Sequence, residues 1–85
     1  MRSFNHKIKD ELGIHARPAG MLVKTVRELD SDIIVSKGEK RASAAKLIAV
    51  MGLGIKHGDE ITVRIEGGNE ENSERVLRKF FEENL

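Results

Sequence analysis

Apolar and polar residues alternate strictly near the start of the chain. Phe4, His6 and Ile8 occupy every second position, and the residues between them are polar. A period of two is typical of a strand with one buried face, because successive side chains of a strand point to opposite sides. The pattern therefore predicts a strand over roughly residues 2–9.

The next apolar positions recur at helical spacing. They form one stripe, made of Ala16, Ala19, Leu22, Val23, Val26 and Leu29. A proline is tolerated in the first turn of a helix, where the N–H that it lacks would have no intrahelical partner. Pro18 therefore predicts a helix that begins near His15, after the loop around Gly13, and runs to about Leu29.

Turn signals divide the middle of the chain into three short elements. Residues 30–32 form a turn cluster, and the β-branched run 33–35 leads to the sequence KGEK at 37–40, with glycine where a hairpin needs it. This pattern predicts two short antiparallel strands. A short helix is predicted over 44–53, where glycines limit its extent. Its apolar residues are Leu47, Ile48, Val50 and Met51.

The C-terminal third predicts one strand and one helix. Apolar residues alternate with polar ones over 61–66, between the turns at 57–59 and 67–68. Asn69 suits a helix N-cap, and the helix after it has one apolar face. That face consists of Val76, Leu77, Phe80 and Phe81. The order β-α-β-β-α-β-α predicts an α+β fold with a single domain over residues 1–85. We expect a two-layer open-faced sandwich, in which three helices cover one side of a four-stranded antiparallel sheet.

Composition narrows the classes of function. The chain has 85 residues, a formal net charge of +1, no cysteine, and three phenylalanines as its only aromatic residues among Phe, Trp and Tyr. Near-neutral charge argues against binding nucleic acid through a broad basic surface, and the scarcity of aromatic rings argues against base stacking. The lack of cysteine excludes disulfides and thiolate chemistry. We see no signal peptide or membrane span, so we expect a cytoplasmic protein without membrane insertion.

One cluster could carry chemistry. The segment GIHARPA at 13–19 places His15 at the predicted start of the first helix. A helix N-terminus presents free N–H groups and partial positive charge, which attract phosphate and favour a neutral, nucleophilic imidazole. The amides of Ala16 and Arg17 remain available as donors, and the Arg17 guanidinium can add a charge-assisted bond to phosphate oxygens. The residues thus suggest a phosphate cradle that contains a nucleophile.

A simpler interpretation remains open. His15 could cap the helix and Arg17 could be a surface charge, and spacing alone does not separate the two interpretations. Of the other histidines, His6 is predicted to pack on the buried face of the first strand and His57 to lie exposed in a turn. Neither has a spacing to His15 that indicates a metal site, so we expect no metal and no cofactor.

The sequence resembles the HPr family, the histidine-containing phosphocarrier proteins of the bacterial phosphoenolpyruvate-dependent sugar phosphotransferase system. Two segments carry the resemblance: GIHARPA at 13–19 and ASAAKLIAVMGLGIKHGDEITV at 42–63. It extends over essentially the whole chain. The resemblance implies that Enzyme I phosphorylates His15, on the δ nitrogen, and that the group then passes to the A domain of a sugar-specific Enzyme II. It also implies that Arg17 stabilises the phosphoryl group and that Pro18 sets the turn.

A carrier must dock two partners through one face, so an exposed apolar patch with a charged rim is expected near His15. The candidate partner-binding residues are Gly20, Met21, Lys24, Arg27, Leu47, Ile48 and Met51. The last three match the family's docking helix, although each could instead belong to the core. Lys24 and Arg27 could be merely solvated charges. We expect a monomer that forms transient complexes.

Lys46 departs from the family pattern. Many relatives carry at this position a serine that a dedicated kinase phosphorylates, and Lys46 cannot accept that modification. Ser43, expected at the end of a strand, is not assigned the role. Lys46 at the start of a helix places a positive side chain beside the partial positive charge of the helix N-terminus, which is unfavourable. This cost suggests another reason for the lysine, such as attraction to acidic partners. Two alternatives remain: a regulatory or nitrogen-branch paralogue with the same phosphohistidine chemistry, and, with less support, an interaction or RNA-binding module.

Overall fold

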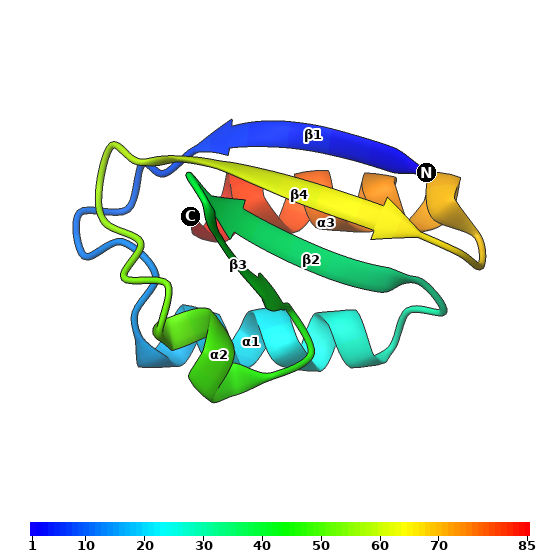
Figure 1. Ribbon diagram of the computed structural model, residues 1–85, viewed down its shortest axis with the longest axis horizontal. Helices are drawn as coiled ribbons and strands as arrows, with labels where there is room; N and C mark the ends of the chain where they lie inside the picture. Colours follow the sequence, from blue (N-terminus) through cyan, green and yellow to red (C-terminus); the bar gives the residue numbers. More distant parts are fainter.

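Four strands form one sheet, and three helices pack with it. The computed structural model describes residues 1–85. The strands are β1 (Arg2–Lys7), β2 (Asp32–Lys37), β3 (Lys40–Ser43) and β4 (Glu60–Glu66). The helices are α1 (Ala16–Arg27), α2 (Leu47–Met51) and α3 (Glu70–Asn84). Their order along the chain, shown in Figure 1, confirms the predicted β-α-β-β-α-β-α arrangement. None of the helices combines the length and the apolar character needed to cross a membrane.

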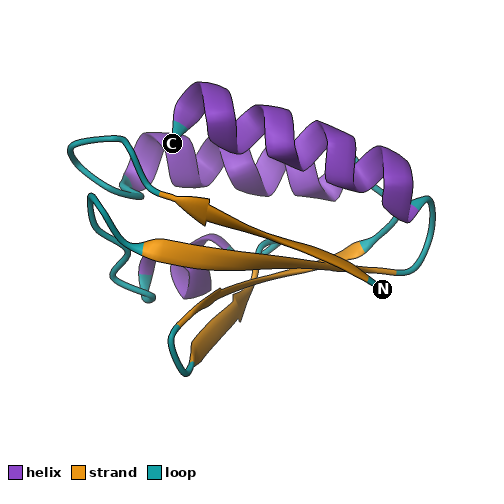
Figure 2. Cartoon of the chain, turned by 90° about the horizontal axis from the view of Figure 1, so that it is seen from above, coloured by secondary structure: helices purple, strands orange, loops and turns teal.

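The sheet has the strand order β1-β4-β2-β3, and every neighbouring pair is antiparallel. Val63 in β4 lies opposite Phe4 in β1 and opposite Val35 in β2, so three neighbouring strands point apolar residues to the same side. Helices α1 and α3 lie over this side and leave the other face of the sheet open (Figure 2). Helix α2 contacts α1 and β3. The predicted two-layer α+β sandwich is therefore confirmed.

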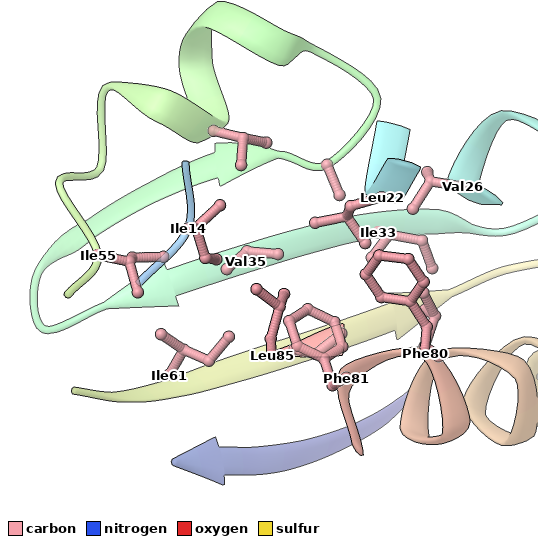
Figure 3. Packing of buried hydrophobic residues seen from close by; sticks show 14 of the residues in the cluster. Ile14, Leu22, Val26, Ile33, Val35, Ile55, Ile61, Phe80, Phe81 and Leu85 are labelled. Carbon is pink, nitrogen blue, oxygen red and sulfur yellow. The ribbon is translucent and has the colours of Figure 1, made fainter. Parts of the chain in front are cut away.

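Aliphatic residues and three phenylalanines fill the space between sheet and helices (Figure 3). Phe81 of α3 is fully buried, and its ring meets the rings of Phe4 and Phe80 edge to face, with centroids 6.1 and 5.7 Å away. Such pairs are favourable because the positive edge of one ring meets the negative face of the other. The predicted N-cap of α3 is confirmed, because the Asn69 side chain accepts the N–H of Asn72.

The ends of two elements differ from the prediction because local hydrogen bonds replace regular pairing. β1 ends at Lys7, not at residue 9, since the next N–H, that of Ile8, donates to the carbonyl of Asp59 outside the strand ladder. α1 ends at Arg27, not at Leu29, because the following N–H groups bond three residues back instead of four. A tightened last turn of this kind satisfies orphan carbonyls at a helix end.

Helix α2 is shorter than the predicted 44–53. The N–H of Ala44 donates to the carbonyl of Ile33, which holds this residue against β2, and Lys46 keeps an extended backbone. At the other end the N–H of Leu53 bonds the carbonyl of Val50, three residues back. The helix is therefore a little more than one turn long, and its flanks belong to loops.

Candidate functional site

The loop before α1 is held against the segment that follows α2. The N–H of Ile14 donates to the carbonyl of Ile55 at 3.1 Å, and both side chains are buried at the same end of the core (Figure 3). Gly13 has φ +68°, and a Cβ at this position would overlap the Ile55 carbonyl and the Cα of Lys56. Glycine is required here for both its conformation and its size. These contacts set where α1 can begin.

His15 stands at the N-cap position of α1, as predicted. Its backbone is extended (φ −107°, ψ −177°), and its side chain makes no capping hydrogen bond. The expectation that the His15 side chain caps the helix is therefore wrong, although the residue does occupy the N-cap position. The imidazole is 40% exposed, and its Nε2 lies 4.0 Å from a carboxylate oxygen of Asp10. The ring is thus accessible from solvent and has an acidic neighbour on its Nε2 side.

Hydrogen-bond donors without a partner surround the first turn of α1. The N–H groups of Ala16 and Arg17 find no acceptor in the chain, and the first N–H of this helix to bond is that of Ala19, to the His15 carbonyl. Pro18 is the third helical residue and is buried, which confirms its predicted place in the first turn. The Arg17 side chain is exposed and unpaired. An anion near His15 would therefore meet two amides and one guanidinium.

The predicted docking residues of α2 are on the surface. Leu47, Ile48 and Met51 are exposed, with Ile48 79% exposed, whereas Val50 is fully buried. The alternative that these three residues belong to the core is therefore wrong. Met21 of α1 is also exposed, and α1 and α2 are in contact. We refer to Met21, Leu47, Ile48 and Met51 as the apolar patch.

Basic residues accompany the apolar patch in different ways. Lys24 is exposed and unpaired, whereas the Arg27 guanidinium donates from Nε and Nη2 to the carbonyl of Ala45 at 3.3 and 3.0 Å. Arg27 is thus more than a solvated charge, because it ties α1 to the loop before α2. Lys46 is the N-cap residue of α2, exposed and without a capping bond. Gly20 faces open space, because a Cβ there would touch nothing within 4 Å.

The structure adds two residues that sequence patterns did not single out. Asp10 reaches towards His15 and also accepts the N–H of Leu12 at 2.8 Å, and Leu12 itself is an exposed apolar side chain in the same loop. Loops have no hydrophobic period, so no pattern could have indicated either residue. Ser43 is the last residue of β3, as expected.

Neither of the other two histidines stands at a helix N-terminus. His6 packs on the ring of Phe81, with centroids 5.4 Å apart, and burial lowers its pKa. His57 is exposed in the turn before β4. No group of three His, Cys, Asp or Glu side chains comes together as a metal site would require.

Comparisons with known proteins agree on one family. A family model described as "PTS HPr component phosphorylation site" matches residues 2–83. The phosphocarrier protein HPr of Mycoplasma genitalium is 34% identical over 85 residues, covering 99% of this chain and 97% of that protein. The solved structure of HPr-C-His from Thermoanaerobacter tengcongensis is similar with a TM-score of 0.91 at 33% identity, covering 96% of this chain and 92% of that one. The HPr dimer from the same organism is similar with a TM-score of 0.76 at 32% identity, covering 98% and 95%.

Proposed function

The chain belongs to the HPr family of phosphocarrier proteins of the phosphotransferase system, and we propose that His15 is the residue on which it carries the phosphoryl group. The observation that carries this proposal is the state of His15. Its imidazole is accessible and does not cap the helix, yet it stands at a helix N-terminus where two N–H groups have no acceptor. A nucleophile and an anion-binding helix end therefore share one site.

The geometry also supports the δ nitrogen as the acceptor atom. A carboxylate oxygen of Asp10 lies 4.0 Å from Nε2 and so occupies the Nε2 side of the ring, and we propose that the lone pair of Nδ1 is the one that reacts. In the transfer, this lone pair forms the new P–N bond while the bond between phosphorus and the donor protein breaks. The amides of Ala16 and Arg17 and the Arg17 guanidinium then balance the charge of the phosphoryl oxygens.

The proposed partners are phosphorylated Enzyme I as donor and the A domain of a sugar-specific Enzyme II as acceptor. Both would meet the apolar patch, which spans α2 and the helix that begins after His15, together with Gly20, Lys24, Arg27 and Lys46 of the same two helices and their flanks. One surface serves two partners in turn, which favours a monomer with transient complexes. We assign the role to residues 1–85 as one domain in the cytoplasm, where phosphoenolpyruvate is available.

The direct test is charging by phosphoenolpyruvate, Mg²⁺ and purified Enzyme I, read by intact mass. We expect one added phosphoryl group that is labile in acid, stable in alkali and absent from His15→Ala. His57→Ala is the matched control, because His57 is also an exposed histidine but lies in a turn and not at a helix N-terminus. Charging of His15→Ala, or no charging of the wild type beside an authentic HPr, would refute the proposal.

Three further measurements test the downstream role, the oligomeric state and the role of Lys46. Transfer from the charged chain to Enzyme IIA supports a role in sugar uptake, whereas charging without onward transfer supports a regulatory or nitrogen-branch paralogue. Sedimentation at increasing concentration tests the monomer. Lys46→Glu tests whether the charge of Lys46 attracts acidic partners, since unchanged charging by Enzyme I at low salt would contradict that role.

A further inference from the structure

A single ammonium group connects three segments at the end of the molecule that carries His15. Lys37, the last residue of β2, contacts a carboxylate oxygen of Asp59 at 2.8 Å and donates to the carbonyl of Gly54 at 2.9 Å. The two charged side chains are only 32% and 29% exposed. The same Asp59 oxygen accepts the N–H of Lys56 at 2.8 Å. We call Lys37, Asp59 and the Gly54 carbonyl the Lys37 clamp.

The clamp holds a segment that lacks regular structure. Between the end of α2 and the start of β4, the chain contains neither helix nor strand. Ile55 lies in this segment, directly after the carbonyl that Lys37 binds, and its own carbonyl accepts the N–H of Ile14. Ile14 precedes His15. In Figure 1, the segment after α2 and the loop before α1 lie together at one end of the molecule.

We propose that Lys37 is a positioning residue for phosphoryl transfer, because its clamp fixes the Ile55 carbonyl that anchors the backbone before His15. This inference rests on the proposed role of His15. No contact between Lys37 and His15 is present, and Lys37 acts through its side-chain hydrogen bond to the Gly54 carbonyl and then through the backbone hydrogen bond from Ile14 to Ile55. Transfer requires the acceptor nitrogen to be held near the phosphorus, and a displacement of about 1 Å can cost on the order of a hundredfold in rate.

The electrostatics of the clamp support its persistence at neutral pH. The hydrogen bond from Lys37, followed by that from the N–H of Lys56, lowers the pKa of Asp59. The carboxylate therefore stays ionised and keeps its attraction for the ammonium. The backbone of Asp59 is also tied to the residue that follows β1, since its carbonyl accepts the N–H of Ile8. The clamp thus joins the hairpin, the loop after α2 and the loop that leads to His15.

The test compares Lys37→Met, which keeps the length of the side chain and removes its charge, with Lys37→Arg and Lys40→Met. Lys40 is the matched control, because it lies opposite Lys37 in the same hairpin but is exposed and unpaired. In Lys37→Met, we expect hydrogen exchange of the Ile14 amide to become about threefold to tenfold faster, while the amide of Val63 in the core changes less. Lys37→Arg restores protection, and Lys40→Met leaves it unchanged.

Kinetics with charged Enzyme I give the second measurement. We expect kcat of phosphoryl transfer to fall about threefold or more in Lys37→Met with KM nearly unchanged, because the apolar patch is not part of the clamp. Asp59→Asn serves as a second variant and should raise Ile14 exchange as well. Unchanged Ile14 exchange in folded Lys37→Met overturns the proposal. The proposal is also overturned if exchange becomes equally faster at Ile14 and Val63 and Lys37→Arg does not restore protection. Lys37 would then stabilise the whole fold and would not position His15.

The exchange measurement uses the uncharged chain alone, so its outcome does not depend on Enzyme I. Failure of the wild type to accept a phosphoryl group would refute the role of His15, even with the clamp intact. Loss of Ile14 protection in Lys37→Met without any change in kcat would refute the positioning role, even with His15 charged normally.

Discussion

Replacing Gly13 with alanine tests the close approach that places His15. Two costs combine in this variant. An alanine at φ +68° loses about 1 to 2 kcal/mol in the left-handed conformation. In addition, its Cβ would lie 2.7 Å from the Cα of Lys56 and would overlap the Ile55 carbonyl, and crowding of this kind costs about 1 to 3 kcal/mol. The free energy of unfolding should therefore fall by about 2 to 5 kcal/mol.

Gly38→Ala provides the matched control. Gly38 has φ +59°, and a Cβ there would meet nothing within 4 Å, so this variant carries only the conformational cost of about 1 to 2 kcal/mol. The difference between the variants, about 1 to 3 kcal/mol, isolates the contact with residues 55 and 56. Urea unfolding followed by circular dichroism measures both. Charging by Enzyme I should slow in Gly13→Ala alone, because the loop must move away from Ile55.

Equal losses of stability in the two variants, within about 0.5 kcal/mol, would refute the reasoning. The approach of Gly13 to Ile55 would then carry no energetic weight. A loss of stability in Gly13→Ala without slower charging would mean that the contact between Gly13 and Ile55 stabilises the fold but does not place His15. Only the prediction of slower charging would then be contradicted.

Three further predictions concern other parts of the molecule. Ile48→Ala should change the free energy of unfolding by no more than about 0.5 kcal/mol and weaken Enzyme I binding about fivefold or more. Val50→Ala should lower the free energy of unfolding by about 1 to 3 kcal/mol, measured by urea unfolding. A larger loss of stability in Ile48→Ala than in Val50→Ala would contradict the burial of the two side chains. Burial lowers the pKa of His6 in the folded state, so on acidification the unfolded chain binds a proton at this residue before the folded chain does. The free energy of unfolding should therefore fall as pH drops below about 6.5. His6→Leu should remove this part of the pH dependence, and an unchanged dependence of the unfolding free energy on pH would argue against the assignment. Asn69→Ala should lower the free energy of unfolding by about 1 kcal/mol through loss of the N-cap of α3, whereas Asn69→Asp should retain most of it in the same urea assay.

Local patterns predicted most of the secondary structure. The alternation around Phe4 and over 61–66, and the stripe that ends in α1, correspond to elements of the structure with end points shifted by one or two residues. These patterns work because burial of one face imposes a period on the sequence. The prediction from pattern was weakest for α2, because a helix of five residues is too short to show a period. Only the family resemblance separated the exposed Ile48 from the buried Val50.

The candidate site was only partly predictable. His15, Arg17 and Pro18 were recognisable as candidates because a helix start, an imidazole and a set of hydrogen-bond donors suited to phosphate are adjacent in sequence. Asp10 was not, because it lies in a loop and its relation to His15 depends on how that loop folds back. The Lys37 clamp was not predictable either, since its members are 17 and 22 residues apart and carry no shared motif.

The amino-acid pattern thus decided which segments form strands and helices and placed His15 at a helix start, since the apolar period and the proline in the first turn are local features of the sequence. The insertion of β4 between β1 and β2, and the joining of Ile14 to Ile55, arose only when the chain packed. These contacts lie between segments far apart in sequence, and they are selected by the burial of one shared core, a property of the whole chain and not of any single segment.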